Sequence, residues 1–400
     1  MSGLVQVDAV VHRQSSVDEL DPATRAPLNE DRIVLRRGRV ALDSSVRHVG
    51  ARLELDMNTL RGLNVRPFEG YVFARYPEDV PALAFSAAEA PSTTSPNAPD
   101  FAVRASAGLM RIPFGFDAVE PDSARPVLER ALSTRAFFGQ ARDLGVSVDA
   151  VYRFARVSLA VMNGEPLSDD RYAGLDPTRG KDIVGRAGVS TPLSAWLWVQ
   201  GGVSWLVGHG LHLGTSPTKG SLQWVDGNED GQVDATELVP IPGSPGTASR
   251  DFERSALGAD LRVGARVPWL GLCVLRAELT RALDLDRTVQ PADPVASGRS
   301  LRELGAQVGL AQELTRFAEL GLRYDLYRPD ADATRNVAAT VVPRDTTYRT
   351  WSIALAGKLP PGRLIAQYDH QQNGLGRSES GAPTTLRDDA FTVRAEVRLP

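Results

Sequence analysis

The chain has 400 residues, a formal net charge of −4 and 24% charged residues, and this balance excludes the strongly basic surface on which nucleic-acid binding depends. Positive charge comes almost wholly from arginine, since the lysines among the 45 basic residues are only Lys181, Lys219 and Lys358. No apolar run approaches the roughly 18 residues of a transmembrane helix, and the start, "MSGLVQVDAV", lacks the features of a signal peptide. We therefore expect either a cytoplasmic protein or a mature chain from which a signal peptide has been removed.

Strict alternation of apolar and polar residues recurs along the chain and indicates β-strands. In "RHVGARLELDMN", residues 47–58, the apolar side chains from Val49 to Met57 fall on one face and the charged side chains on the other. Segments of about ten alternating residues, in even number, are typical of a transmembrane β-barrel. The sequence thus predicts an all-β fold, a sixteen-stranded antiparallel transmembrane β-barrel formed by residues 1–400 as a single domain. The predicted strands are 3–12, 32–42, 47–58, 64–75, 101–112, 143–152, 155–163, 182–191, 195–206, 256–267, 271–282, 301–312, 316–327, 346–357, 362–370 and 391–399.

Long and short links alternate between these strands, so the long links gather at one end of the barrel. Outer-membrane barrels place short turns in the periplasm and long loops outside. One pair departs from the rule, because the link near 58–63 is short where a long one is expected, and 76–100 is long where a short one is expected. The long polar links are 13–31, 113–142, 163–181, 207–251, 283–300, 328–345 and 371–388.

A soluble all-β protein would also show alternation, because each of its strands would turn one face to a core. Nearly every strand here carries charge opposite its apolar face, which favours the membrane barrel. Membrane barrels carry aromatic girdles at both interfaces, and several aromatic residues near predicted strand ends could supply part of them. These are Trp196, Trp198, Trp205, Trp269, Trp351, Phe68, Tyr71, Tyr324 and Tyr348.

A series of motifs begins with "GLMRIPFGFD" at 108–117, continues with "PVLERALSTRAFFGQARDLGVSV" at 126–148 and ends with "LAVMNGEP" at 159–166. Their order and spacing resemble the central signature of the phosphate-selective porin O/P family. The arginine-rich "IVLRRGRVAL" at 33–42 also resembles the second strand of that family. The matching residues are Pro113, Phe114, Gly115, Asp117, Glu129, Arg130, Arg142, Asp143, Leu144, Gly145, Asn163 and Gly164.

The resemblance implies a homotrimeric outer-membrane channel, in contact with outer-membrane lipid, whose third long loop folds into the lumen and narrows it. Here that constriction loop is 113–142. A guanidinium in a narrow pore replaces part of an anion's hydration by forked hydrogen bonds, so arginines favour anion passage. Alternatively, the loop arginines pair with nearby acids and brace the loop. The predicted pore residues are Arg125, Arg130, Arg135, Arg142, Arg52 and Arg104.

With three lysines the chain cannot build the lysine cluster of the phosphate-specific members, and its predicted lumen faces mix acidic and basic residues. We therefore predict a porin for passive diffusion of small hydrophilic solutes, anionic or neutral, with a weak preference for anions and with phosphate among the candidates. No enzyme is expected, because the sequence shows no Ser/His/Asp set, no Cys/His pair and no Gly-rich phosphate loop.

Residues 226–237, "DGNEDGQVDATE", have the spacing of an EF-hand calcium loop. Oxygen ligands recur along such a loop, a carboxylate closes it at position 12, and glycine at position 6 permits the sharp turn. The alternative is an acidic, solvated turn. The run lies in the long external link 207–251, where calcium can be millimolar and an affinity of about 10⁻⁴ to 10⁻³ M would suffice. The predicted ligands of one structural calcium ion are Asp226, Asn228, Asp230, Gln232, Asp234 and Glu237.

Two other functions stay open beside the porin. One is a non-conducting, calcium-binding surface barrel that acts as an adhesion or structural platform. The other is a soluble calcium-binding β-protein. We expect the bacterial outer membrane as the location, with the signal peptide already removed.

Overall fold

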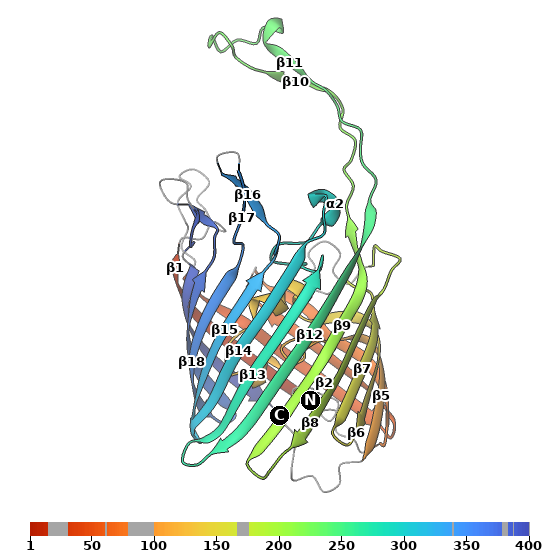
Figure 1. Ribbon diagram of the computed structural model, residues 1–400, viewed down its shortest axis with the longest axis vertical. Helices are drawn as coiled ribbons and strands as arrows, with labels where there is room; N and C mark the ends of the chain where they lie inside the picture. Colours follow the sequence, from red (N-terminus) through yellow and green to blue (C-terminus); the bar gives the residue numbers. More distant parts are fainter. Residues whose placement is uncertain are drawn as a thin grey trace.

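The computed structural model describes residues 1–14, 31–60, 62–78, 100–165, 176–337, 340–377, 383–386 and 388–399, and its main feature is one closed barrel (Figure 1). Sixteen antiparallel strands form it, each paired with its neighbours along the chain, and β1 pairs with β22 to close the ring. The predicted all-β, sixteen-stranded fold is confirmed. The barrel strands are β1 (Ser2–Gln14), β2 (Arg32–Val46), β3 (Val49–Asn58), β4 (Asn64–Tyr76), β5 (Phe101–Arg111), β6 (Arg142–Tyr152), β7 (Ala155–Met162), β8 (Asp182–Pro192), β9 (Leu197–His212), β12 (Arg250–Val267), β13 (Gly271–Leu283), β14 (Arg302–Thr315), β15 (Ala318–Arg328), β18 (Tyr348–Leu359), β19 (Gly362–Gln372) and β22 (Asp388–Leu399).

Every predicted strand corresponds to an observed one, and the largest differences are in β9 and β12. Both strands continue six residues further at the long-link end than the alternation indicated. The extension of β9 reads "VGHGLH", in which glycine and histidine obscure the alternation. It nevertheless pairs in register with β12, from Val207 opposite Ser255 to His212 opposite Arg250.

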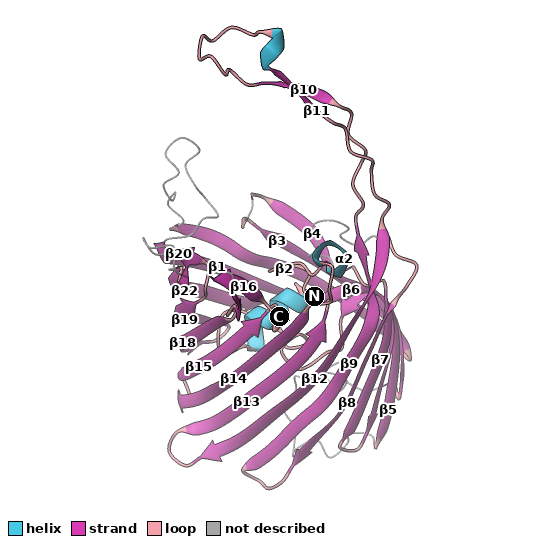
Figure 2. Cartoon of the chain, turned by 45° about the horizontal axis from the view of Figure 1, so that its top comes forward, coloured by secondary structure: helices cyan, strands magenta, loops and turns pink. Residues whose placement is uncertain are grey.

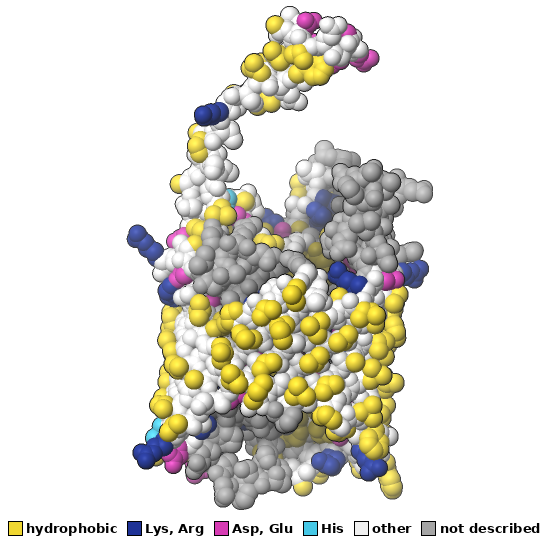
Figure 3. All heavy atoms as spheres, turned by 180° about the vertical axis from the view of Figure 1, so that it is seen from behind, with side chains coloured by type: hydrophobic (Ala, Val, Ile, Leu, Met, Phe, Trp, Pro, Cys, Tyr) yellow, Lys and Arg dark blue, Asp and Glu magenta, His cyan; other side chains and the backbone are white. Residues whose placement is uncertain are grey.

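The outer face of the barrel is apolar and the inner face is charged, as β3 shows most clearly. Leu53 and Leu55 are 46% and 41% exposed, whereas Glu54 and Asp56 between and beyond them are 7% and 2% exposed. On the face of the barrel that Figure 3 shows, hydrophobic side chains spread over the outer wall, and charged side chains lie near its two rims. This is the architecture of an outer-membrane barrel, and a soluble protein of this kind would leave the apolar belt in water.

At least three of the proposed girdle residues lie inside the barrel: Tyr71 and Tyr348 pack against the apolar cluster of the lumen, and Phe68 is the most buried. Phe68 is 1% exposed and lies inside the barrel, between the guanidinium groups of Arg39 and Arg142, which stand 3.6 and 3.5 Å from its ring centroid. Trp269 and Trp351 do lie on the exterior, at 101% and 54% exposure. Alternation missed Phe68 because the register of β3 and β4 shifts at a bulge near Glu54.

The long links form the upper rim and the short turns the lower rim in Figure 1. The short connection between β3 and β4 lies at the long-link end, as predicted, while most of the unusual link 76–100 lies outside the described residues.

Residues 213–249 form an arm that extends far above the barrel and ends in a two-stranded sheet of β10 (Ser221–Trp224) and β11 (Leu238–Ile241) (Figure 1). No helix among the described residues is long and apolar enough to cross a membrane. The smaller elements of the rim and arm are η3 (Ala235–Glu237), α2 (Pro294–Ser297), β16 (Thr334–Val337), β17 (Thr340–Pro343), β20 (Gly376–Arg377) and β21 (Pro383–Thr384).

Candidate functional site

The link between β5 and β6 leaves the wall and runs inside the barrel, where its helix α1 (Leu132–Phe138) is visible within the ring of strands (Figure 2). We call residues 112–141 the lumen loop; it also contains η2 (Asp122–Ala124). The chain turns inward at Gly115, whose φ is +59°. A Cβ added at this position would lie 2.2 Å from Oε1 of Glu278 on β13. Oε2 of Glu278 accepts the N–H groups of Phe116 and Asp117, each at 3.1 Å. Glycine is thus favoured at the turn, and the Glu278 carboxyl group fixes the chain after it.

Apolar side chains anchor the lumen loop to two patches of the inner wall. Phe114, Phe137 and Phe138 are at most 2% exposed and form one cluster with residues of β7, β9 and β15. Val127 and Leu128 form a second cluster with residues of β18 and β19. Each buried phenylalanine is worth about 2 to 3 kcal/mol of transfer free energy, so these contacts alone hold the loop firmly. The wall residues are Met162, Leu206 and Tyr327 in the first cluster and Ala354, Ala356 and Ile365 in the second.

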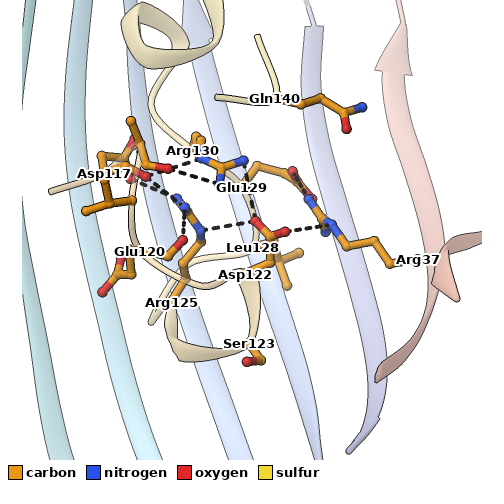
Figure 4. Close-up of polar contacts among 12 residues, drawn as sticks. Arg37, Asp117, Glu120, Asp122, Ser123, Arg125, Leu128, Glu129, Arg130 and Gln140 are labelled. Carbon is orange, nitrogen blue, oxygen red and sulfur yellow. Dashed lines mark hydrogen bonds and ion pairs between the residues drawn. The ribbon is translucent and has the colours of Figure 1, made fainter. Parts of the chain in front are cut away.

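A buried ionic network joins the same loop to strands β2 and β22, and Figure 4 shows part of it. Asp122 lies within 2.7 Å of Arg39 and 3.4 Å of Arg37, both on β2. Glu129 pairs with Arg37 at 2.8 Å and with Arg394 of β22 at 2.8 Å. Because charges in a lumen are costly unless they are paired, this network explains how so many ionic groups can be buried together.

Arg125 and Arg130 belong to this network, and Arg142 is buried beside it in an ion pair with Glu69 of β4. The Arg125 side chain is 2% exposed and donates to the Asp117 carboxylate at 2.8 Å. Arg130 donates to the Asp117 carbonyl oxygen at 3.2 Å, and Arg142 donates to Glu69 at 3.0 Å. This is the arrangement expected of residues that brace the loop, and their part in ion passage stays a prediction.

The other predicted arginines lie elsewhere. Arg135, on α1, is exposed within the lumen, and its guanidinium makes no hydrogen bond or ion pair with any residue that the structure describes. Arg52 pairs with Glu69 at 2.9 Å, and Arg104 pairs with Asp149 at 3.2 Å. The structure therefore does not gather the six arginines into one ring, and Arg135 is the one among them whose guanidinium faces open space.

A cavity of about 690 Å³ opens at the long-link end, above the lumen loop. Its lining carries more positive than negative groups. A second cavity of about 260 Å³ shares Arg36, Glu129, Arg130 and Arg135 with it, so the two meet around Arg135. Neither is lined by Arg52 or Arg104. The arginines of the larger cavity are Arg36, Arg37, Arg39, Arg66, Arg130, Arg135, Arg254 and Arg287, and its carboxylates are Asp56, Glu129, Glu165, Asp284 and Asp286.

Sequence reasoning missed most of these cavity residues. Arg36, Arg37 and Arg39 lie in the arginine-rich segment 33–42, so the signal for them was present. Arg254 lies in the part of β12 that alternation did not reach. Arg287 lies in a link that was expected to stay outside.

That link, between β13 and β14, also folds toward the lumen. The Asp286 carboxylate accepts the N–H groups of Thr288, Val289 and Gln290 at 2.8 to 2.9 Å, which forms a tight turn. The N–H of Arg287 donates to the carbonyl oxygen of Ala136 at 2.9 Å, and Oγ1 of Thr288 donates to that of Arg135 at 2.8 Å. Residues 284–292 thereby hold α1 from above and form one side of the cavity.

The predicted calcium loop lies at the tip of the arm, far from the lumen (Figure 1). Gly231 has a φ of +69°, and its N–H donates to Oδ2 of Asp226 at 2.9 Å. The Glu237 carboxylate accepts the N–H groups of Gly227 and Asn228 at 3.2 and 3.3 Å. Oδ1 of Asp226 is buried and makes no hydrogen bond, although the arm around it is open to solvent. Within the described ranges no three His, Cys, Asp or Glu side chains converge as a ready metal site, and calcium binding stays a prediction.

The remaining predicted ligands also serve the loop's own backbone. Oδ1 of Asn228 accepts the N–H of Asp230 at 2.9 Å, and Oδ1 of Asp230 accepts the N–H of Gln232 at 2.8 Å. The N–H of Glu237 donates to the carbonyl oxygen of Asp234 at 3.0 Å. These bonds curl the chain between Asp226 and Glu237.

The fold and the lumen together define a sixteen-stranded outer-membrane β-barrel with an inward-folded loop. No protein-family model matches the sequence, and no curated protein matches it, so the resemblance to the phosphate-selective porin O/P family stays a prediction.

Solved structures share the whole fold at low sequence identity. The outer membrane channel DcaP of Acinetobacter baumannii has a TM-score of 0.55 and 11% identity, over 100% of this chain and 96% of that one. An anion-selective porin from Comamonas acidovorans has a TM-score of 0.52 and 10% identity, over 100% and 98%. The trimer form of OmpT, an outer membrane protein of Vibrio cholerae, has a TM-score of 0.53 and 9% identity, over 99% and 98%. At this identity the likeness establishes the fold.

Proposed function

We propose that the chain is a porin of the bacterial outer membrane, a water-filled channel through which small hydrophilic solutes diffuse passively, with a weak preference for anions, phosphate included. The observation that carries the proposal is the cavity at the external mouth, which is lined by eight arginines and five carboxylates. Arginines that line a pore lower the cost of an anion's partial dehydration. The shared fold of a channel and of an anion-selective porin supports the same function.

The test is ion selectivity in planar bilayers, measured as the reversal potential across a KCl gradient. We expect anion preference in the native protein and a smaller preference in Arg135→Gln, because that guanidinium is exposed in the lumen. The matched control is Arg316→Gln, which removes the same charge from a short turn at the opposite end of the barrel. A barrel that stays closed, or that prefers cations, would contradict the proposal.

The alternative function is a non-conducting surface barrel. It is favoured by one observation, the two apolar clusters and the ionic network through which the lumen loop contacts strands around the ring. Liposome swelling with small neutral sugars separates the two functions, because a porin admits the sugar and a plugged barrel does not.

We propose that the barrel works as a homotrimer in outer-membrane lipid. The apolar belt supports the contact with lipid, and one structural neighbour is described as a trimer form. Light scattering of the detergent-solubilised protein tests the number of chains: a mass of one chain would refute the trimer.

We also propose that residues 226–237 bind one calcium ion that orders the tip of the arm. A two-stranded sheet standing alone is only marginally stable in water, so β10 and β11 would gain from a bound cation. The buried, unpartnered Oδ1 of Asp226 is the oxygen that such an ion would satisfy. Asp226, Asn228, Asp230, Asp234 and Glu237 would supply side-chain oxygens and Gln232 its carbonyl oxygen.

Trp224 provides the signal for this test, because its indole N–H donates to Oε2 of Glu237 at 2.9 Å. Calcium bound by Glu237 would change the tryptophan environment, and titration calorimetry would report an affinity of about 10⁻⁴ to 10⁻³ M. Asp226→Asn should weaken binding. If millimolar calcium produces no heat and no change in arm melting, the loop is only an acidic turn.

A further inference from the structure

The lining of the larger cavity includes apolar as well as cationic side chains, and we call them its apolar side and its cationic side. The Phe252 ring lies over Gly210, where a Cβ would stand 2.4 Å from the ring, so the glycine leaves room for it. Val289, Pro291 and Ala292, from the inward-folded link, complete this side. These residues face a space that a small inorganic anion would not fill.

The cationic side is built around Arg135, with Arg36 and Arg287 nearby in the lining. Arg36 is held by Glu129 at 3.0 Å, and Arg287 by Asp182 at 2.7 Å. The Arg135 guanidinium has no such partner among the described residues, so its donors are available to a ligand. One carboxylate can accept two parallel hydrogen bonds from a guanidinium.

The size of the cavity, about 690 Å³, lies within the range of roughly 300 to 1,000 Å³ that is common for sites of small organic ligands. Phosphate alone would contact the arginines and leave the apolar side in water. An organic anion would use both sides, because burial of apolar surface adds to the pairing of charge.

We infer that this cavity is a binding site for organic anions, of the class of monocarboxylates that carry a compact apolar body, such as an aromatic ring. The carboxylate pairs with Arg135, and the apolar body packs against Phe252 and Pro291. The inference rests on the proposed function as a porin, and gives it a preferred class of solute.

The experiment uses the full-length protein in planar bilayers with benzoate, acetate, phosphate and benzyl alcohol as probes. Current in KCl alone establishes the channel, so a closed barrel counts against the proposed function and not against this inference. In that case titration calorimetry with the same four probes tests the site directly. We expect benzoate to reduce the current at about one tenth of the concentration of acetate, because burial of the ring adds to charge pairing. Phosphate and benzyl alcohol should both act more weakly than benzoate.

Two variants separate the two sides of the cavity. Arg135→Gln should weaken benzoate and acetate alike, by about tenfold, because both lose the same charge-assisted pairing. Phe252→Ser should weaken benzoate and leave acetate unchanged, and Pro291→Ser replaces it if the first variant does not fold. Arg316→Gln, at the opposite end of the barrel, controls for the loss of a charge. The inference is overturned if phosphate equals benzoate, if benzyl alcohol equals benzoate, or if both apolar-side variants bind benzoate normally.

Discussion

Replacing Asp122 by asparagine should weaken the attachment of the lumen loop to the barrel wall. The carboxylate is shared by four guanidinium groups, those of Arg39, Arg37, Arg125 and Arg130, at 2.7, 3.4, 3.4 and 3.5 Å. The amide has nearly the same shape but no charge, so the variant tests the ionic contribution alone.

The magnitude follows from what each arginine keeps after the change. Arg39 retains Asp56 at 2.9 Å, and Arg37 retains Glu129 at 2.8 Å. Arg125 retains Asp117 at 2.8 Å, but Arg130 retains only carbonyl oxygens at 3.2 and 3.4 Å. One buried cation therefore loses its carboxylate, and breaking a buried pair in this way costs about 3 to 5 kcal/mol.

Hydrogen exchange of the lumen loop measures this cost, because local opening sets the exchange rate. Protection of residues 116–131 should fall by about two to four orders of magnitude, while the barrel strands keep theirs. The matched control, Asp332→Asn, removes an exposed carboxylate paired with Arg302 on the rim and should leave the loop unchanged. Unchanged protection in Asp122→Asn would refute the reasoning that the ionic network holds the loop.

Three further outcomes are expected. Gly115→Ala should displace the start of the lumen loop and raise single-channel conductance, since the new Cβ would lie 2.2 Å from Oε1 of Glu278; equal conductance would mean that the wall yields instead. Phe138→Ala should lower the stability of the docked loop by about 3 to 5 kcal/mol, measured by the same exchange experiment, and a loss below 1 kcal/mol would contradict its role as an anchor. The hydrogen bond from Trp224 lowers the pKa of Glu237, so this carboxylate keeps its charge to a lower pH than an ordinary glutamate does. The Trp224 signal should therefore change at a pH below the ordinary glutamate pKa; a change at that pKa would count against the bond.

The barrel could be predicted from the sequence because membrane strands repeat one requirement at every second residue. Leu53 and Leu55 must face lipid, while Glu54 and Asp56 must face the lumen, and this alternation is visible in a single sequence. The ends of the strands were harder to predict from the sequence. The extension of β9 is fixed by pairing with β12 and not by its own pattern.

The candidate site was less predictable, because its parts meet only in three dimensions. Arg125 and Arg135 lie ten positions apart in one loop and look alike in sequence, yet the first is enclosed by Asp117 and Glu120 and the second faces open space. The difference depends on the path of the loop, because Arg125 directly follows η2 and Arg135 lies on α1. The inward fold of residues 284–292 depends on the Asp286 turn and on contacts to α1, neither of which leaves an alternating pattern.

The contacts of Glu129 have a consequence for the order of assembly. Its partner Arg394 also pairs with Asp8 at 2.7 Å, and these two residues stand on the last and first strands of the barrel. Arg394 thus joins the lumen loop to the seam of the barrel, and its pair with Asp8, 386 positions away, forms only after the two ends of the chain have met. Such distant pairings form late, and interactions formed after the rate-limiting step slow unfolding more than they speed folding. The contact of the loop with Arg394 should thus slow the separation of β1 from β22 and lengthen the lifetime of the closed barrel.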